Sequence, residues 1–316
     1  MNNLKKIGLT ALAGSLVVTS AFAGELTATG AASMGVANIT GTADDGKGKN
    51  FTMGNSVYLA GSGELDNGLT VSLSFEMDQG TANNSSEGFD NHYVQIGSDA
   101  LGTLRFSGHG GSSAQGAMDT TAAGDLWNNT LGLTGGPAAA ASGDNSLFYT
   151  LPALVDGVAV TASLAPGGTT GTNASTHMSY GVSYTGVEGL TVNYGTGDSG
   201  VQGAEVDHTT MSASYALGSL TLSVSRTDID NAGATADKEW DSYQVAYTIS
   251  ENISATYGSE TVDTSTSSVD EEVTGFGVSY TTGGMTISAS QINAEGGGNE
   301  AAADTDRWSL SAAFAF

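Results

Sequence analysis

Side chains that could carry out catalysis are few and scattered in this sequence. The four histidines, His92, His109, His177 and His208, do not stand at the spacing of a metal site or a catalytic pair. The chain contains no Cys, which excludes thiolate chemistry and disulfide bonds. It also lacks a Gly-x-Ser-x-Gly elbow, a Gly-rich phosphate loop and a His-Glu-x-x-His motif. We therefore expect no enzymatic activity and no cofactor.

Carboxylates are the one abundant kind of reactive side chain. Two acidic groups in expected loops, Asp228 with Asp230 and the run Asp270-Glu271-Glu272, offer the hard oxygen ligands that Ca²⁺ prefers. A solvated acidic rim is the simpler interpretation of the same residues. The sequence therefore predicts either a structural calcium site or an acidic rim at these positions.

The charge balance excludes one class of partner. The chain has 316 residues, long enough for one large domain or two ordinary ones, and carries 33 Asp and Glu against 8 Lys and Arg. Nucleic acid binding depends on clustered cations that contact phosphates, and this chain has no such cluster. We expect no nucleic acid partner.

The first 23 residues have the pattern of a secretory signal peptide. Lys5 and Lys6 precede an apolar run from 7 to 18, and Ala21-Phe22-Ala23 fits the cleavage rule. A buried N-terminal helix is the alternative. Cleavage would leave residues 24–316 as one domain, with six bases against 33 acids and a formal charge of −27. No later stretch approaches 18 consecutive apolar residues, so a membrane-spanning form would have to be a closed β-barrel.

The elements that must position any site are short strands. Along nearly all of 24–316, apolar residues alternate with small or polar ones, which places them on opposite faces of a strand. The run 305–316 is the clearest example, because its apolar parity ends on the aromatic Phe316. Lipid against the apolar face would explain a chain that stops on an uncovered hydrophobic strand.

Connections of two lengths take turns along the chain. Seven short turns, several containing Gly after Asn or Gly, alternate with eight long loops. The long loops are expected at 40–50, 79–90, 108–144, 166–175, 197–207, 228–239, 261–271 and 293–304. This rhythm predicts an all-β, 16-stranded antiparallel transmembrane β-barrel, since an even strand number with short turns at one end is the outer-membrane pattern. A soluble β-sandwich would show a less regular rhythm.

The distribution of charged and aromatic residues agrees with a lipid-facing surface. The apolar parity carries no charge at central strand positions, where a charge would cost about 2–4 kcal/mol. Arg226 is on that parity, near a strand end or beside a bulge. Aromatic residues near run ends predict belts at the membrane interfaces, although strand propensity alone also favours them. The expected anchoring aromatics are Trp308, Phe314, Phe316, Tyr215 and Tyr280, with Tyr58, Tyr180, Tyr194 and Tyr257 at similar positions.

The segment 108–144 is about three times longer than the other loops and is rich in Gly, Ala and Thr. The stretch 102–108 before it (Gly-Thr-Leu-Arg-Phe-Ser-Gly), the stretch 144–152 after it (Asp-Asn-Ser-Leu-Phe-Tyr-Thr-Leu-Pro) and the closing aromatic strand occur in a fixed order. In these motifs the chain resembles the trimeric general diffusion porins of Gram-negative bacteria, of alphaproteobacterial type. The resemblance extends to the layout of the whole mature chain.

This resemblance implies a homotrimer in the outer membrane whose third loop folds into the lumen as a constriction. Carried over by position, Asp119 and Asp125 would be acids of that loop and Arg105 a base on the wall, with Glu76 and Asp78 on the same lumen face. The family's cluster of wall arginines is nearly missing here, because 51–63, 68–78 and 91–98 contain no Lys or Arg.

The resemblance also implies partners. Lipopolysaccharide would surround the barrel, and the barrel-assembly machinery would recognise the terminal strand that ends at Phe316. Related porins bind calcium in their loops, which bears on the acidic groups at 228–230 and 270–272.

The function expected from these features is passive diffusion of small hydrophilic solutes and ions. The excess of acids predicts a preference for cations. Two alternatives stay open: a structural or adhesin-like barrel with a plugged lumen, and a substrate-specific channel. The second would require a ladder of aromatics or bases along the lumen face.

Overall fold

The computed structural model describes residues 26–41, 48–78, 89–118, 120–123, 136–167, 175–201, 203–233, 235–299 and 303–316. The expected signal peptide, 1–23, lies outside these ranges. Sixteen strands and one short 3₁₀ helix make up the regular structure of the described residues. None of the helices within these ranges is long and apolar enough to cross a membrane.

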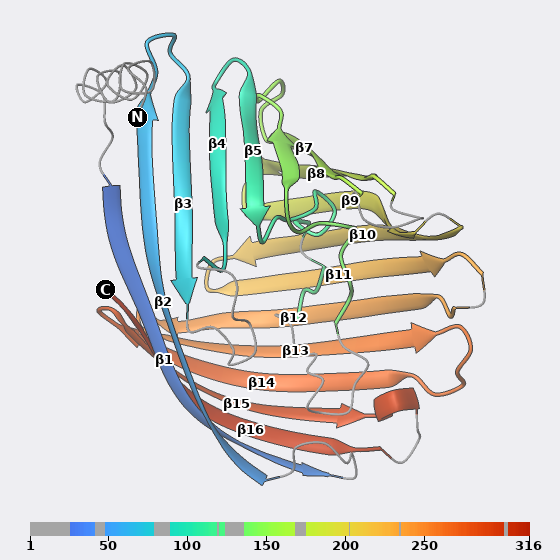
Figure 1. Cartoon of the computed structure of the whole chain (residues 1–316). Coiled ribbons are helices and arrows are strands. Elements are labelled where there is room, and N and C mark those ends of the chain that lie inside the picture. Colours follow the sequence, from blue (N-terminus) through green and yellow to red (C-terminus); the bar gives the residue numbers. More distant parts are fainter. Residues whose placement is uncertain are drawn as a thin grey trace, which may run out of the picture.

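The strands follow the chain in the order drawn in Figure 1. Their bounds are β1 (Leu26–Gly41), β2 (Gly48–Glu64), β3 (Thr70–Asp78), β4 (His92–Ser98), β5 (Gly102–His109), β6 (Ser146–Thr150), β7 (Val158–Ala165), β8 (His177–Val187), β9 (Leu190–Val201), β10 (Ala204–Leu217), β11 (Leu220–Asn231), β12 (Lys238–Ser250), β13 (Ile253–Thr264), β14 (Glu271–Thr282), β15 (Met285–Glu295) and β16 (Thr305–Ala315), with η3 (Gly297–Asn299) before β16.

Each strand pairs antiparallel with its neighbours in sequence, and β1 pairs with β16 to close the sheet into a barrel. The last residue takes part in this closure, because Gly30 N donates to Phe316 O at 2.6 Å and Phe316 N donates to Gly30 O at 3.0 Å. A Cβ on Gly30 would stand 2.3 Å from the Phe316 ring, so glycine is needed there. The predicted sixteen-stranded barrel is confirmed.

One end of the barrel, which we call the turn end, carries the short connections. Glycines with positive φ stand in most of these turns, at 68, 157, 189, 218 and 283, where another residue would be strained. The loop end differs from the prediction. Strands run through much of the expected loops at 197–207, 228–239, 261–271 and 293–304, and β9 and β10 are separated only by residues 202–203.

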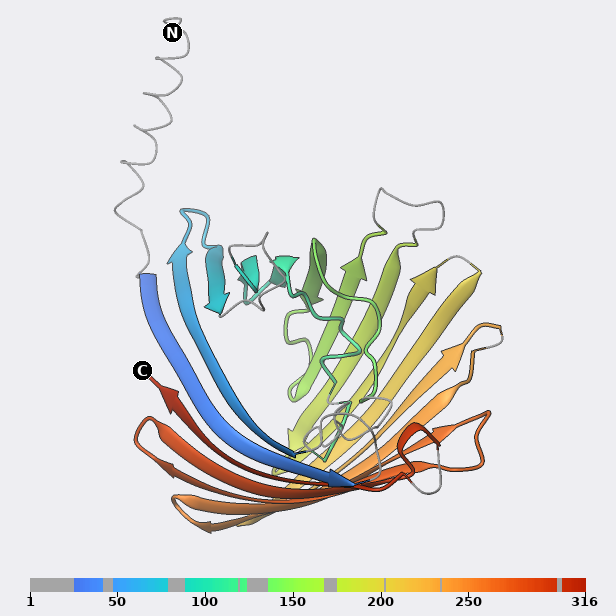
Figure 2. The same ribbon diagram turned by 60° about the horizontal axis from the view of Figure 1, so that its bottom comes forward.

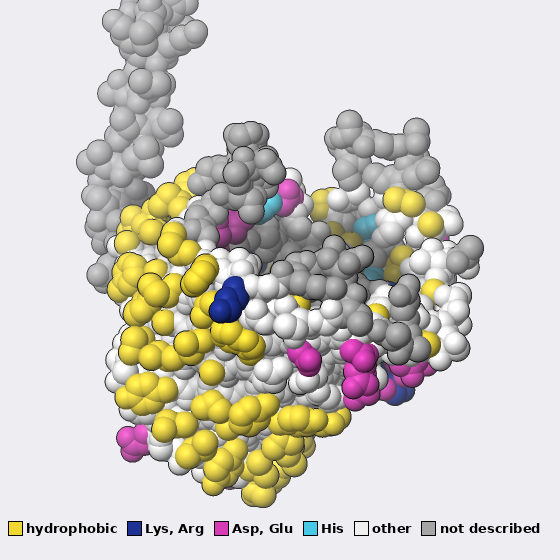
Figure 3. Space-filling model, turned by 90° about the horizontal axis from the view of Figure 1, so that it is seen from below, with side chains coloured by type: hydrophobic (Ala, Val, Ile, Leu, Met, Phe, Trp, Pro, Cys, Tyr) yellow, Lys and Arg dark blue, Asp and Glu magenta, His cyan; other side chains and the backbone are white. Residues whose placement is uncertain are grey.

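The apolar parity of the strands forms the outer surface, and Figure 3 shows hydrophobic side chains gathered over this wall. Exposed members on three strands are Val224 on β11, Val245 on β12 and Leu310 on β16. All five predicted anchoring aromatics share this parity, and four of them, Trp308, Tyr215, Tyr280 and Phe316, are clearly exposed. Tyr58 was wrongly placed in the belt: it pairs with Glu76 on the inner face.

Near the loop end of β10 to β16 this pattern inverts. On β11 the outward residues change from Leu222 and Val224 to Arg226, Asp228 and Asp230, while the inward Ile229 is buried. The register from β10 through β12 is unbroken, so no bulge moves Arg226, and it faces outward as its parity predicts. Its guanidinium donates to both Asp241 oxygens and lies 3.1 Å from Glu239. We infer that these strands extend beyond the lipid, where water replaces acyl chains outside.

The barrel wall is lower at β3 to β7, on the side away from β10 to β14. Strands β3 to β7 contain 9, 7, 8, 5 and 8 residues, whereas β10 to β14 contain 12 to 14. Figure 2 shows the shorter strands in cyan and green. Five residues extend only about 17 Å along a strand, less than the roughly 25 Å apolar band of such barrels.

A charge should destabilise the barrel much more on the outer face of a strand than on its inner face. Val245→Arg places a cation on the outer face of β12 and should reduce the free energy of unfolding in lipid vesicles by about 2–4 kcal/mol. Gln244→Arg, one residue away on the inner face, should cost much less because water or polar groups surround it. Urea titration of both variants measures the difference. Equal losses would show that the inner and outer faces are wrongly assigned.

Candidate functional site

The long segment between β5 and β6 begins and ends at a narrow neck. Gly111 and Gly143 exchange two backbone hydrogen bonds, at 3.2 and 3.1 Å. Beside them, His109 Nδ1 lies 2.8 Å from Asp144 Oδ1. The two ends of the segment are therefore fixed to each other at the rim of the barrel wall.

From this neck, the described residues 113–118 run along the inner side of the sheet (Figures 1 and 2). The backbone N of Ala114 donates to Ser163 Oγ on β7 at 3.0 Å and to Ser179 Oγ on β8 at 2.8 Å. Further along, Ser212 Oγ on β10 donates to Met118 O at 2.9 Å. Serine side chains of the wall therefore supply partners for the loop backbone.

Gln115 joins the outgoing and returning parts of the segment. Its side chain is fully buried, with Nε2 donating to Thr210 Oγ1 at 2.7 Å and Oε1 accepting from Ala140 N at 2.8 Å. The returning part is also held by His208, whose Nδ1 lies 3.1 Å from Ala138 O. Ala141 N donates to Asp198 O at 3.0 Å. Two of the four scattered histidines, His109 and His208, thus hold this segment in place.

Residues 120–123 continue along β11 and β12. Ala122 N donates to Ser225 Oγ at 2.9 Å and to Ser242 Oγ at 2.6 Å, and Thr227 Oγ1 donates to Thr120 O at 3.1 Å. Because these groups are buried, each lost hydrogen bond would leave an unsatisfied polar atom at a cost of about 1–3 kcal/mol.

Glycines on the same strands make room for the loop. A Cβ on Gly195 of β9 would lie 2.9 Å from Gln115 Cα, and one on Gly181 of β8 would lie 2.7 Å from Ala114 O. On β13, a Cβ on Gly258 would lie 3.0 Å from Ala123 Cβ. We call this row of inward Gly, Ser and Thr residues on β7 to β13 the loop seat.

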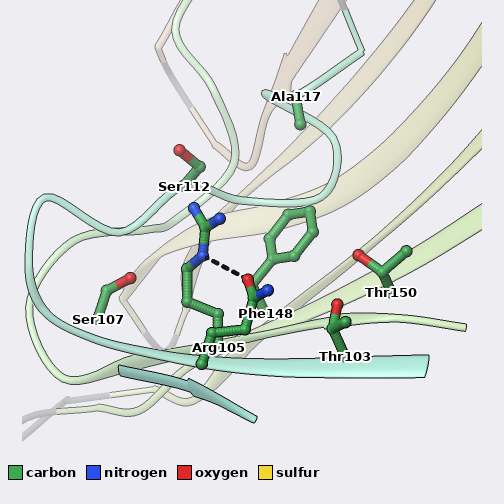
Figure 4. A pocket seen from close by; sticks show the side chains of 8 residues that line it. Thr103, Arg105, Ser107, Ser112, Ala117, Phe148 and Thr150 are labelled. Atoms are coloured by element: carbon green, nitrogen blue, oxygen red, sulfur yellow. Dashed lines mark hydrogen bonds between the residues drawn. The ribbon is translucent and has the colours of Figure 1, made fainter. Parts of the chain in front are cut away.

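The predicted charged residues of the wall lie on the other side. Tyr58 OH and Asn91 Nδ2 donate to the two Glu76 oxygens, each at 2.6 Å, and Asp78 lies on the same parity of β3. Arg105 on β5 donates through Nε to Gln95 Oε1 at 3.2 Å (Figure 4). The predicted loop acids Asp119 and Asp125 lie outside the described residues.

A buried apolar cluster on the inner face was missed by the sequence analysis. It lies near the loop end and consists of Ile39, Ile229, Trp240, Val262, Val273, Ile292 and Ala294. Apolar residues on the otherwise polar parity of several strand ends were the available signal. This part of the interior is packed rather than water-filled.

Sequence comparison decides the family. A family model described as Gram-negative porin matches residues 8–261. The chain belongs to this family. It is therefore a membrane-embedded protein of the bacterial outer membrane, and family and fold together point to a non-enzymatic channel. Among curated proteins, no relative matches the sequence.

Two solved porins and a further outer-membrane protein have the same fold as this porin. An anion-selective porin from Comamonas acidovorans superposes with a TM-score of 0.72 at 14% identity, covering 92% of this chain and 99% of that one. A porin refined at 1.8 Å resolution gives 0.70 at 18% identity, covering 92% and 100%. A loop L8 deletion mutant of OmpT, an outer-membrane protein of Vibrio cholerae, gives 0.70 at 16% identity, covering 93% and 99%.

The acidic groups considered for calcium do not come together in this porin. Asp228 and Asp230 are on β11, whereas Glu271 begins β14 and Asp270 directly precedes it, with β12 and β13 lying between the two groups. The prediction that Glu271 is a loop residue is wrong. It begins β14, is fully buried, and its Oε1 accepts a hydrogen bond from Gly298 N at 2.8 Å. Within the described ranges, no three His, Asp or Glu side chains form a group that could hold a metal ion. Calcium binding stays a prediction.

A disulfide can test the loop seat, because the chain has no cysteine of its own. The pair Ala122→Cys with Ser242→Cys replaces a hydrogen-bonded contact and should oxidise readily in the folded porin, since a disulfide needs Cα atoms within about 7 Å. Adding Gly258→Leu, which crowds Ala123, should slow its formation several-fold. Gly277→Leu on β14 is the control, because its Cβ would lie 3.0 Å from Thr256 Oγ1 and away from the loop. Equal slowing by both would contradict the seat.

Proposed function

We propose that this porin is a passive channel for small hydrophilic solutes and ions. The observation that carries the proposal is the closed sixteen-stranded barrel with a polar inner face, along which one long segment is fixed. Barrels of sixteen strands are wide enough to enclose an aqueous channel. Solutes would cross down their own gradients, with no energy input.

The segment between β5 and β6 constricts this channel. Support comes from its contacts with the inner face of six consecutive strands, β7 to β12, and from the glycines that let it lie close to the wall. Because the described parts of its backbone, 113–118 and 120–123, are held through buried hydrogen bonds, we expect the constriction to be a fixed narrowing rather than a gate.

Cations are the preferred ions. The mature chain carries 33 acids against six bases, and a channel lined by one sign of charge concentrates ions of the opposite sign. The Comamonas acidovorans porin is anion-selective by its description, so the shared fold does not set the preference. Selectivity must depend on the charged side chains of each member.

A plugged structural barrel is the competing function. The inner apolar cluster near the loop end favours it, because part of the interior is filled there. The cluster involves β1 and β11 to β15, however, and leaves the inner face of β2 to β5 polar, with Tyr58, Glu76 and Arg105. This polar inner face favours the channel.

A homotrimer protects the low wall. Strands β4 to β7 are too short to cover the apolar thickness of a bilayer, yet their outer residues include exposed Val94, Leu104 and Phe106. Contact with neighbouring copies would cover this surface. Next to it, an apolar groove of about 520 Å³ between β1, β2 and β16 contains Met34, Phe51 and Met53, which extends the same face.

Lipopolysaccharide surrounds the remaining, taller wall. The outward acids at its loop end, such as Asp228, Glu239 and Asp241, would stand at the level of the headgroups. The barrel-assembly machinery would recognise β16, which ends at the exposed Phe316.

Ion selectivity tests the channel directly. In a planar bilayer across a KCl gradient, the wild-type porin should show discrete conductance steps and a cation-selective reversal potential. Lower salt should increase the selectivity, because the screening length grows from about 10 Å at 0.1 M to about 30 Å at 0.01 M. Asp119→Asn with Asp125→Asn should weaken it, and Asp66→Asn at the turn end should not. Anion preference would refute the charge assignment, and absence of conductance from folded protein would favour the plugged barrel.

A second experiment tests the trimer. Phe106→Asp on the outer face of β5 should release monomers, which native mass spectrometry in detergent detects. Val224→Asp makes the same change on the tall wall and should lower barrel stability while the trimer persists. If the Phe106→Asp variant stays trimeric and the Val224→Asp variant dissociates, the trimer interface lies on the tall wall and the proposal is wrong.

A further inference from the structure

A recess of about 180 Å³ lies between the low wall and the start of the long segment (Figure 4). Strands β4 to β6 form one side, and Ser112 and Ala117 of the segment form the other. Three hydroxyl groups of the wall, on Thr103, Ser107 and Thr150, line it together with the charged Arg105 and the ring of Phe148. The recess therefore combines one cation, several hydrogen-bonding groups and one aromatic surface.

Arg105 is held in a fixed orientation. Its Nε donates to Gln95 Oε1 at 3.2 Å, and its guanidinium carbon lies 4.2 Å from the centre of the Tyr93 ring. Both contacts come from β4 and leave the two terminal amino groups without a partner among the described residues. The ion pairs of the described residues involve Arg226 and histidines but not Arg105. Within the part of the chain that the structure describes, no carboxylate forms an ion pair with this guanidinium.

Phe148 supplies the other half of the site. It is the cross-strand partner of Arg105 in the β5–β6 register, so its ring and the guanidinium border the same space. In Figure 4 the ring stands beside the guanidinium, with Ala117 above it. A ligand for this recess needs an anionic group for the paired N–H donors and a small apolar body for the ring.

We propose that this recess binds small organic carboxylates, and that the porin therefore contains one anion-binding site, which we call the station, inside a cation-preferring channel. The inference rests on the proposed function, because the ligand reaches the recess through the lumen. A carboxylate matches the fork of the guanidinium with two parallel hydrogen bonds. An inorganic cation is repelled by Arg105, and inorganic phosphate leaves the Phe148 ring without a partner. The volume limits the ligand to roughly the size of a benzoate ion.

The acidic mouth and the station act on an anion in opposite directions. Repulsion by the net charge lowers the local anion concentration, and this long-range effect weakens as salt screens it. The contact with Arg105 is at short range and is screened much less. Occupancy by a carboxylate should therefore be higher at moderate salt than at low salt, the reverse of ordinary ion pairing at a surface.

Current block by benzoate tests the proposal. With symmetric KCl in a planar bilayer, benzoate should reduce single-channel current in a saturable way, and neutral benzamide should not. Arg105→Gln should raise the half-blocking concentration at least about tenfold, as expected when a charge-assisted hydrogen bond is lost. Arg307→Gln, which removes one charge from the inner parity of β16, is the matched control and should change it less than about twofold. Phe148→Ala should weaken block by benzoate more than any block by inorganic phosphate.

Each contrary result has a separate meaning. If Arg105→Gln and Arg307→Gln weaken block by benzoate equally, the effect comes from the overall charge of the channel, and Arg105 does not form a binding site. Block by phosphate that matches block by benzoate and is insensitive to Phe148→Ala would remove the organic ligand class. If the folded porin does not conduct, the proposed function fails. Calorimetric titration of benzoate then tests the binding site alone: the wild type should bind benzoate and Arg105→Gln should not.

Discussion

The fold depends on one constraint, which is that no backbone N–H or C=O may face lipid without a partner. An isolated sheet always has two open edges, and in a bilayer each unpaired group would cost several kcal/mol. Here β1 and β16 remove both edges by pairing over 31–41 and 305–315, and Gly30 and Phe316 add two further hydrogen bonds. The number of strands sets the bore, and in a barrel of sixteen strands the side chains of the wall alone do not fill it.

The medium outside the barrel then sets the pattern of each strand. Where acyl chains lie outside, the outer parity is apolar and the inner parity is small or polar, as with Val224 and Ser225 on β11. Four to six residues after Val224, water lies outside, Asp228 and Asp230 face outward, and the buried Ile229 faces inward. The same physical rule produces both patterns, because burial of apolar surface is favourable on whichever side excludes water. The inner apolar cluster is thus a small conventional core above the membrane.

This inversion explains how far the sequence could be interpreted. Alternation, glycine-containing turns and the terminal aromatic strand predicted the barrel, its strand number and its turn end correctly. The loop end was less predictable, because acids at 228–230 and 271–272 suggested loops, whereas they continue their strands with the opposite phase. Tyr58 was misplaced for a related reason: an aromatic residue near a strand end is compatible with either face until its partner, Glu76, is known. The loop seat could not be predicted at all, since Gly195, Ser225 and Ser242 are ordinary small residues until the register brings them together.

The register also places two features on different strands: the residues that hold the long segment and the charged residues of the inner face. The loop seat on β7 to β13 uses backbone hydrogen bonds and missing Cβ atoms, so it determines where the segment lies without using charged side chains. Charged groups such as Glu76 and Arg105 stand on β3 and β5, each oriented by its own neutral partners, Tyr58 and Asn91 for the acid and Gln95 and Tyr93 for the base. Neutral partners fix a charged group without cancelling its field, which an ion pair would do. Sequence change at the charged positions can therefore alter the charge of the inner face while the loop seat keeps the described parts of the segment in place.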